Sequence, residues 1–254
     1  MKDMNHHKFD LDPKKNVTTL HPGQIWLGGQ GDSFVGAGAF KTAHTATLVL
    51  LVPTLSSIRS CTHKTIIIKC PYTCCPGRFN EGPFNCLRVR EESEKLFCKA
   101  NVLYWAKALF KLTEDFIAKR IARAQDPPPF VIPSVCFVDA AFTFQYPPGP
   151  ARGLRAPVID CTYLCEEEIE DAEMSFIKLT HNSNCVPLLK PGELGYEVAQ
   201  FLTFTQHIQY LKMKGSAYVS DYQGMYLDQS TKLSSPTWTG TMSLLTDSQI
   251  LTHL

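Results

Sequence analysis

The sequence predicts an α+β fold of two lobes, in which the first lobe consists mainly of strands with one long helix and the second lobe is mixed. Segments 65–69 and 158–169 are rich in β-branched and apolar residues, which is typical of buried strands. Segment 90–124 contains no glycine or proline and repeats apolar residues at helical spacing. With 254 residues, of which 44% are hydrophobic, the chain has a natural size for one two-lobed domain.

The first expected element is a polar N-terminal extension over residues 1–31, before a first lobe over 32–165. A glycine-containing segment follows it and runs through Gly36 and Gly38. Backbone amides approach a phosphate closely only where side chains are absent, so this segment is a candidate phosphate cover. A flexible glycine linker is the equally weighted alternative, because such loops are common.

The strand 65–69 is expected to be central and ends in Lys69, whose ammonium is a candidate for pairing with nucleotide phosphates. Taken alone, a lysine that extends from a strand end into water is the commoner case. The helix over 90–124 begins with Glu91, Glu92 and Glu94, which suit the positive end of a helix. One of these carboxylates is also a candidate partner for Lys69.

Strand character returns over 131–144 and again over 158–169, after which the second lobe is expected to extend over 166–254. The acidic end of the second of these strands, with Glu166, is a candidate hinge at which a nucleotide base binds. Apolar residues at helical spacing predict a helix over 194–210, and the strand 216–220 then leads to Asp221.

Two short acidic phrases near the end of the chain suggest the chemistry. The first contains Asp221 and Gln223, and the second contains Asp247 and Gln249. Carboxylate and amide oxygens are hard ligands that suit Mg²⁺ and the phosphates it carries. Together with an upstream lysine and a glycine segment, they favour phosphoryl transfer.

Composition argues against several other classes of protein. A net charge of +1 gives no basic excess of the kind that nucleic-acid binding requires. Residues 1–16 carry no apolar signal-peptide core, and the apolar run 46–55 is short and broken by Pro53, so neither secretion nor a membrane anchor is expected. The ten cysteines form no Cys-x-x-Cys pair, and without a secretion signal reduced structural thiols are expected. The absence of targeting signals predicts an intracellular, cytoplasmic protein.

A set of ordered phrases carries a family resemblance over about residues 34–253. The chain resembles the catalytic domain of alpha-type (atypical) protein kinases, and the fungal members most. The phrases are 36–44, 67–72, 100–106, Phe176-Ile177-Lys178 with Asn182, 204–207, 221–224 and 245–250. This resemblance implies a serine/threonine protein kinase that uses ATP and Mg²⁺ on a protein substrate.

The resemblance also implies roles for individual positions. Asp221 is expected to bind the metal, to accept the proton of the substrate hydroxyl, or both; the sequence leaves these roles open. The implied roles are ATP binding for Lys69, Lys41, Gly36, Gly38 and Asn182, catalysis for Asp221, Asp247 and Lys178, and Mg²⁺ binding for Asp221 and Gln223.

Three features depart from the family pattern. Met225–Ser243 is an insertion. Lys99 stands where relatives tend to have a glutamate, so the usual partner of Lys69 is either absent or supplied by Glu94. The family's zinc site joins a histidine like His207 to a later His and Cys pair; the sequence ends at Leu254 without it, which makes zinc doubtful. The alternative function is a non-catalytic, nucleotide-binding scaffold or an incomplete kinase. The protein substrate and the oligomeric state are left open.

Overall fold

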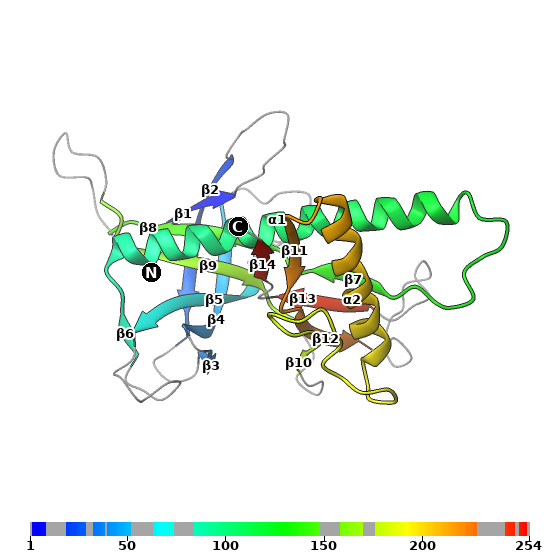
Figure 1. The fold of residues 1–254 in the computed structure, drawn as a ribbon. Helices are drawn as coiled ribbons and strands as arrows, with labels where there is room; N and C mark the ends of the chain where they lie inside the picture. Colours follow the sequence, from blue (N-terminus) through cyan, green and yellow to red (C-terminus); the bar gives the residue numbers. More distant parts are fainter. Residues whose placement is uncertain are drawn as a thin grey trace. The chain divides into compact units, whose positions relative to one another are not determined.

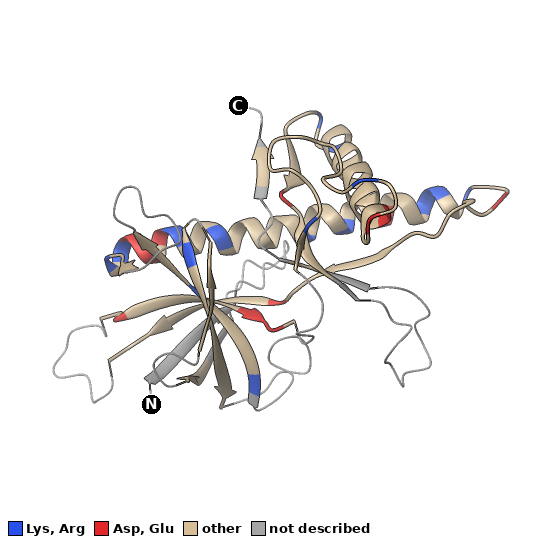
Figure 2. Cartoon of the chain, turned by 90° about the horizontal axis from the view of Figure 1, so that it is seen from below, with Lys and Arg blue, Asp and Glu red and all other residues tan. Residues whose placement is uncertain are grey.

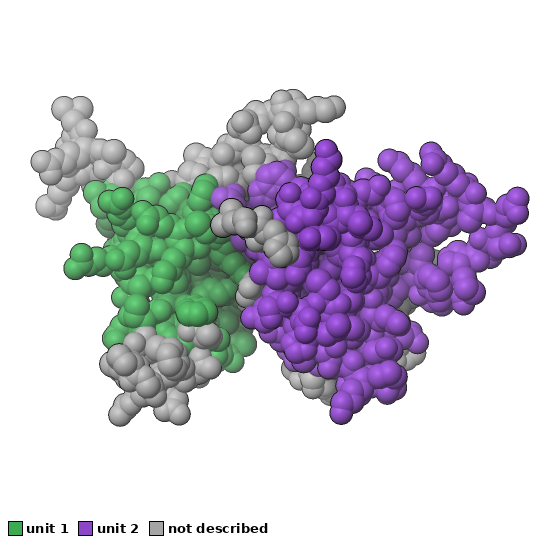
Figure 3. Space-filling view, viewed as in Figure 1, with its two compact units in different colours: residues 1–100, 139–168 green, residues 101–138, 169–254 purple. Residues whose placement is uncertain are grey.

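The fold is α+β, as the sequence predicts, and Figure 1 shows its helices and strands. The computed structural model describes residues 2–8, 19–28, 33–38, 40–51, 63–73, 84–147, 158–169, 176–227, 242–246 and 249–252. Its contacts divide the chain into two compact units, coloured in Figure 3. Unit 1 comprises residues 1–100 and 139–168, and unit 2 comprises residues 101–138 and 169–254.

Unit 1 is built on a sheet of eight strands within the described residues, in the order β3-β4-β2-β1-β8-β9-β5-β6. An additional pairing between β4 and β5 closes six of these strands into a ring, which is the arrangement of a small antiparallel barrel. The strands are β1 (Lys2–Lys8), β2 (Thr19–Leu27), β3 (Phe34–Ala37), β4 (Lys41–Leu50), β5 (His63–Thr73), β6 (Asn85–Cys86), β8 (Ala140–Gln145) and β9 (Cys161–Glu167).

The two faces of this sheet have different characters because side chains alternate along each strand. One face forms an apolar core that includes Leu48, Ile66, Ile68 and Cys165, each at most 2% exposed. Lys69 lies at an odd position of β5 and therefore points to the opposite face. The strand alternation thus separates the barrel core from the charged residues of the candidate site.

The long helix α1 (Val89–Ile121) contributes residues to both units, because the division falls after residue 100. Acidic residues lie in its first turn and basic residues in its last, where they compensate the helix dipole (Figure 2). In unit 1, Glu92 of α1 accepts hydrogen bonds from the backbone N–H and the hydroxyl of Thr162 at 2.9 and 3.1 Å. Burial raises the pKa of this carboxyl, while the two hydrogen bonds oppose the shift.

Unit 2 contains a sheet in the order β10-β12-β13-β7 and a separate pair formed by β11 and β14 within the described residues. Its apolar core gathers Ala106 and Phe110 of α1, Phe137 of β7, and Tyr222 and Leu245. The elements are β7 (Ser134–Phe137), β10 (Ile177–Lys178), α2 (Tyr196–Lys212), β11 (Ala217–Ser220), β12 (Gln223–Leu227), β13 (Met242–Thr246) and β14 (Gln249–Thr252). Neither α1 nor α2, the helices that are described, combines the length and hydropathy needed to cross a membrane.

Helix α2 begins after Gly195, whose φ of 88° lies in the left-handed region that favours glycine. A Cβ at this position would come within 2.9 Å of Ile177 Cδ1 and 3.3 Å of Leu189 Cδ1. The glycine therefore allows α2 to start in close contact with Ile177, the residue before Lys178. This contact ties the start of α2 to one strand of the candidate site.

One sequence expectation needs correction, and two other expected segments can be located in the structure. Residues 1–31 were expected to form a polar extension, yet they contribute β1 and β2 to the barrel through backbone pairing with each other, with β4 and with β8. The glycine segment contains the short strand β3, which pairs with β4. The expected insertion, Met225–Ser243, begins in β12 and ends in β13, and its residues 228–241 lie outside the described residues.

The described cysteines differ in exposure, which predicts their reactivity. Cys86 and Cys98 are exposed, whereas Cys165 lies in the barrel core, where burial raises its pKa to about 12. Because the thiolate is the reactive species, we expect iodoacetamide to modify Cys98 and Cys86 rapidly in the folded protein and to leave Cys165 unmodified. Peptide mass spectrometry of the alkylated native protein measures this, and early modification of Cys165 would contradict the buried placement.

Candidate active site

Unit 1 contains one candidate functional cluster, which is a buried ion pair. Lys69 Nζ of β5 donates to Glu166 Oε2 of β9 at 2.7 Å, and the two side chains are only 9% and 3% exposed. Lys69 lies opposite Leu164 and Ile67 lies opposite Glu166, so the two charged residues are diagonal neighbours on one face of the sheet. The strand register therefore holds the ammonium at a fixed position.

Glu94 was a candidate partner of Lys69, and the structure pairs it with another residue. Glu94 lies on α1 with a side chain 66% exposed, and its Oε1 accepts a hydrogen bond from Arg90 Nε at 3.0 Å. Glu166, which was predicted to lie at a nucleotide hinge, directs its carboxylate to Lys69. Sequence reasoning missed this pair because its members are 97 residues apart and meet only through the β5–β9 register.

The glycine segment and Lys41 lie beside this pair in the sheet. Ala43 of β4 lies opposite Lys69, so Lys41, two residues earlier, is on the same face of the sheet. The turn before it is closed by a hydrogen bond from Gly38 N–H to the carbonyl of Lys41 at 2.8 Å, and the Tyr72 hydroxyl donates to the carbonyl of Gly38 at 2.5 Å. A Cβ at Gly36 would meet nothing within 4 Å, so space is open at this point of the segment.

The second cluster is in unit 2 and centres on Asp221, in the connection between β11 and β12. Its φ of 57° places it in the left-handed region, which Asp and Asn adopt more readily than other non-glycine residues. Its N–H donates to the carbonyl of His181 at 3.2 Å, and the following N–H of Tyr222 donates to Thr180 Oγ1 at 3.0 Å. These hydrogen bonds hold Asp221 in a backbone conformation that residues within a continuous strand do not adopt.

Lys178 and Gln223 join Asp221 in this cluster. Lys178 Nζ lies 2.6 Å from Asp221 Oδ1, and the side chains are 43% and 11% exposed. Lys178 of β10 is directly opposite Gln223 of β12 in an antiparallel pair. Three of the predicted catalytic and metal residues are therefore brought together, as an ammonium, a carboxylate and an amide.

The remaining predicted residues have different outcomes. Asn182 is exposed in the turn that follows His181, and Asp247 lies outside the described residues. His207 is exposed on α2. In the described ranges there is no group of three or more His, Cys, Asp or Glu side chains arranged to hold a metal ion.

The residues of the second cluster fit a magnesium ion that is held jointly with nucleotide phosphates. Mg²⁺ commonly takes one or two protein oxygen ligands and completes its shell with phosphate and water. Asp221 supplies a carboxylate and Gln223 an amide oxygen, while Lys178 supplies a neighbouring positive charge. The donor set thus suits the metal, and Asp221 and Gln223 are the residues that would hold it.

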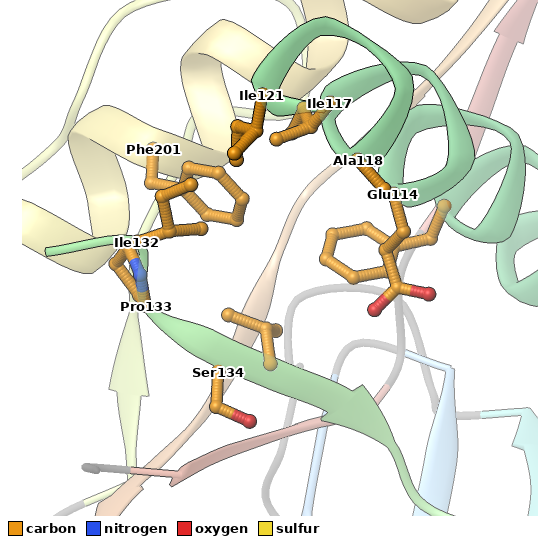
Figure 4. Close-up of a pocket in the computed structure, with 10 residues that line it drawn as sticks. Glu114, Ile117, Ala118, Ile121, Ile132, Pro133, Ser134 and Phe201 are labelled. Carbon is orange, nitrogen blue, oxygen red and sulfur yellow. The ribbon is translucent and has the colours of Figure 1, made fainter. Parts of the chain in front are cut away.

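A separate hollow occurs in unit 2, with a volume of about 180 Å³ (Figure 4). It lies between the second half of α1, residues 132–135 and Phe201 of α2. Glu114 and Ser134 are the polar residues among its mainly apolar lining. None of the predicted site residues lines it, so it is not part of either cluster.

The described residues thus form an α+β fold with one charged cluster in each unit. Among solved structures, it is similar to a mutant of the myosin heavy chain kinase A catalytic domain. The TM-score is 0.51 and the sequence identity 14%, and the match covers 99% of this chain and 83% of that chain. No protein-family profile and no curated protein matches the sequence. The likeness establishes a fold similar to that of an alpha-kinase catalytic domain.

Proposed function

We propose that the chain is an alpha-type serine/threonine protein kinase that transfers the γ-phosphate of Mg-ATP to a protein hydroxyl. The observation that carries the proposal is the grouping of Lys178, Asp221 and Gln223 around a fixed left-handed backbone position. The kinase-like fold supports it, because a match over nearly the whole chain is to a kinase catalytic domain.

The chemistry of phosphoryl transfer depends on positioning and charge neutralisation more than on a strong base. When bound, Mg-ATP supplies the transferable phosphoryl group and the divalent charge. Lys69 offers a positive charge whose position Glu166 restrains, since both side chains are buried. Asp221 supplies a carboxylate that binds the metal or accepts the proton of the substrate hydroxyl, and Lys178 lies beside it.

The test is transfer of radiolabelled γ-phosphate from ATP to the protein itself and to a basic protein substrate. We expect Mg²⁺-dependent labelling of serine or threonine that stops when EDTA is added, since one or two protein oxygen ligands cannot retain the metal against a chelator. A folded protein that binds ATP without transferring phosphate would identify a nucleotide-binding scaffold. Absence of both binding and transfer would remove the kinase proposal.

A further inference from the structure

Helix α2 carries two buried glutamines that cover one edge of strand β11. Gln209 Oε1 accepts the backbone N–H of Val219 at 2.8 Å, and Gln206 Nε2 donates to the carbonyl of the same residue at 3.0 Å. The two glutamines are three positions apart and therefore lie on one helix face. Their amides satisfy the N–H and C=O of Val219 in the way that a neighbouring strand does.

Gln209 extends this support to the residue next to Asp221. Its Nε2 donates to the hydroxyl of Tyr222 at 3.3 Å, and that hydroxyl lies 3.4 Å from Thr205 Oγ1. Because Thr205 Oγ1 donates to the carbonyl of Leu202 at 2.7 Å, the Tyr222 hydroxyl donates to Thr205. One directed chain of hydrogen bonds thus runs from Gln209 through Tyr222 to the backbone of α2.

This chain of hydrogen bonds is completely buried. Gln209, Thr205, Tyr222 and Val219 each have no exposed surface, which makes every hydrogen bond of the chain costly to lose. The side-chain amide at position 209 can accept a hydrogen bond from Val219 and donate another to Tyr222 at the same time.

Asp221 is therefore held between two fixed neighbours. Val219 and Tyr222 are bound to α2 by Gln209, and the backbone N–H groups of Asp221 and Tyr222 are bound to the segment that contains Thr180 and His181. The left-handed φ of Asp221 lies in the short span between these anchors. Because Tyr222 directly follows Asp221, we expect a shift of Tyr222 to alter the direction of the Asp221 carboxylate.

We propose that Gln209 is a positioning residue of the active site, which orients Asp221 through Val219 and Tyr222. This inference rests on the proposed kinase function. Gln209 belongs to none of the sequence motifs that carry the family resemblance, and its hydrogen bonds are to Val219 and Tyr222 on either side of Asp221.

The kinetic test compares the wild-type protein with Gln209→Leu and Tyr222→Phe, and with Gln200→Leu as a control on the exposed side of the same helix. A small misplacement of a reacting group lowers the rate strongly, so we expect Gln209→Leu to lower kcat about tenfold or more, with KM for ATP within about threefold of wild type. Tyr222→Phe, which loses only the hydroxyl, should show a smaller loss of kcat. Gln200→Leu should retain wild-type kinetics.

Gln209→Glu adds a pH-dependent readout. A protonated glutamic acid accepts from Val219 and donates to Tyr222, as the glutamine does, whereas the carboxylate cannot donate. Because burial favours the neutral acid, kcat relative to wild type should recover as the pH falls from about 8 to about 6. A Gln209→Glu variant whose kcat relative to wild type stays low at both ends of this pH range, or a Gln209→Leu variant with wild-type kcat, overturns the proposal.

Hydrogen exchange separates failure of this inference from failure of the kinase function. We expect faster amide exchange over residues 218–224 in Gln209→Leu, measured by mass spectrometry below the melting temperature, and no change in Gln200→Leu. A wild-type protein without transfer activity contradicts the kinase function alone. Unchanged exchange over residues 218–224 contradicts the positioning role, whatever the activity.

Discussion

Asp221→Asn is expected to lower phosphoryl transfer by about 10²- to 10³-fold, which is the usual effect of removing one preorganised charge-stabilising group. The substitution removes the charge that pairs with Lys178 at 2.6 Å but keeps a side chain of nearly the same shape. Asparagine also adopts the left-handed backbone found here at φ 57°, so the variant tests the carboxylate and not the turn. Initial rates of labelled phosphate transfer at saturating Mg-ATP measure the effect.

Two variants serve as controls for this substitution. Asp115→Asn removes another aspartate in a lysine pair, because Asp115 Oδ1 lies 3.0 Å from Lys111 Nζ on the exposed face of α1, and it should leave transfer unchanged. Asp221→Ala should lose activity and also about 1–2 kcal/mol of stability, since alanine disfavours the left-handed region. Wild-type activity in Asp221→Asn would exclude Asp221 from the chemistry.

The sequence predicted those elements whose signals are local. The apolar repeat without glycine or proline gave α1, observed over Val89–Ile121, and the β-branched run gave β5. Strand β1 was not predicted, because its sequence KDMNHHK lacks β-branched residues and its conformation depends on backbone pairing with β2 and β8. Pairing with strands that are distant in sequence can therefore impose strand conformation on a segment whose own preference for it is weak.

The sequence predicted the residue types of the candidate site but not the hydrogen bonds that position them. The motifs named Lys178, Asp221 and Gln223, and the structure places them together. The alternation of Asp221 and Gln223 indicated a strand edge, whereas Asp221 lies in a left-handed turn imposed by hydrogen bonds to residues 180 and 181. No local pattern signals those bonds, because they join segments about 40 residues apart in the chain.

Lys69→Met is expected to destabilise the protein by about 3–5 kcal/mol, because it leaves the carboxylate of Glu166 buried without its ammonium partner. The pair is 9% and 3% exposed, so solvent screens the remaining charge only weakly. The double variant Lys69→Met with Glu166→Leu should recover most of this loss, since two apolar side chains can replace a buried ion pair. Urea unfolding measures both free energies.

A neighbouring pair on the same two strands provides the matched control. Lys64 Nζ donates to Glu167 Oε1 at 2.5 Å, but these side chains are 25% and 31% exposed. Partial exposure lowers the value of an ion pair, so Lys64→Met should cost about 1 kcal/mol or less. If Lys69→Met and Lys64→Met lower the free energy of unfolding equally, burial does not make the Lys69 pair more important for stability than the Lys64 pair.

ATP binding then separates the structural role of Lys69 from its functional role. The double variant should be nearly as stable as the wild type, yet it lacks the ammonium that the proposed function assigns to the nucleotide phosphates. We therefore expect ATP binding, measured by calorimetry, to remain weak in the double variant and to be retained in Lys64→Met. A stable double variant with wild-type ATP affinity would show that Lys69 stabilises the barrel and does not bind the nucleotide.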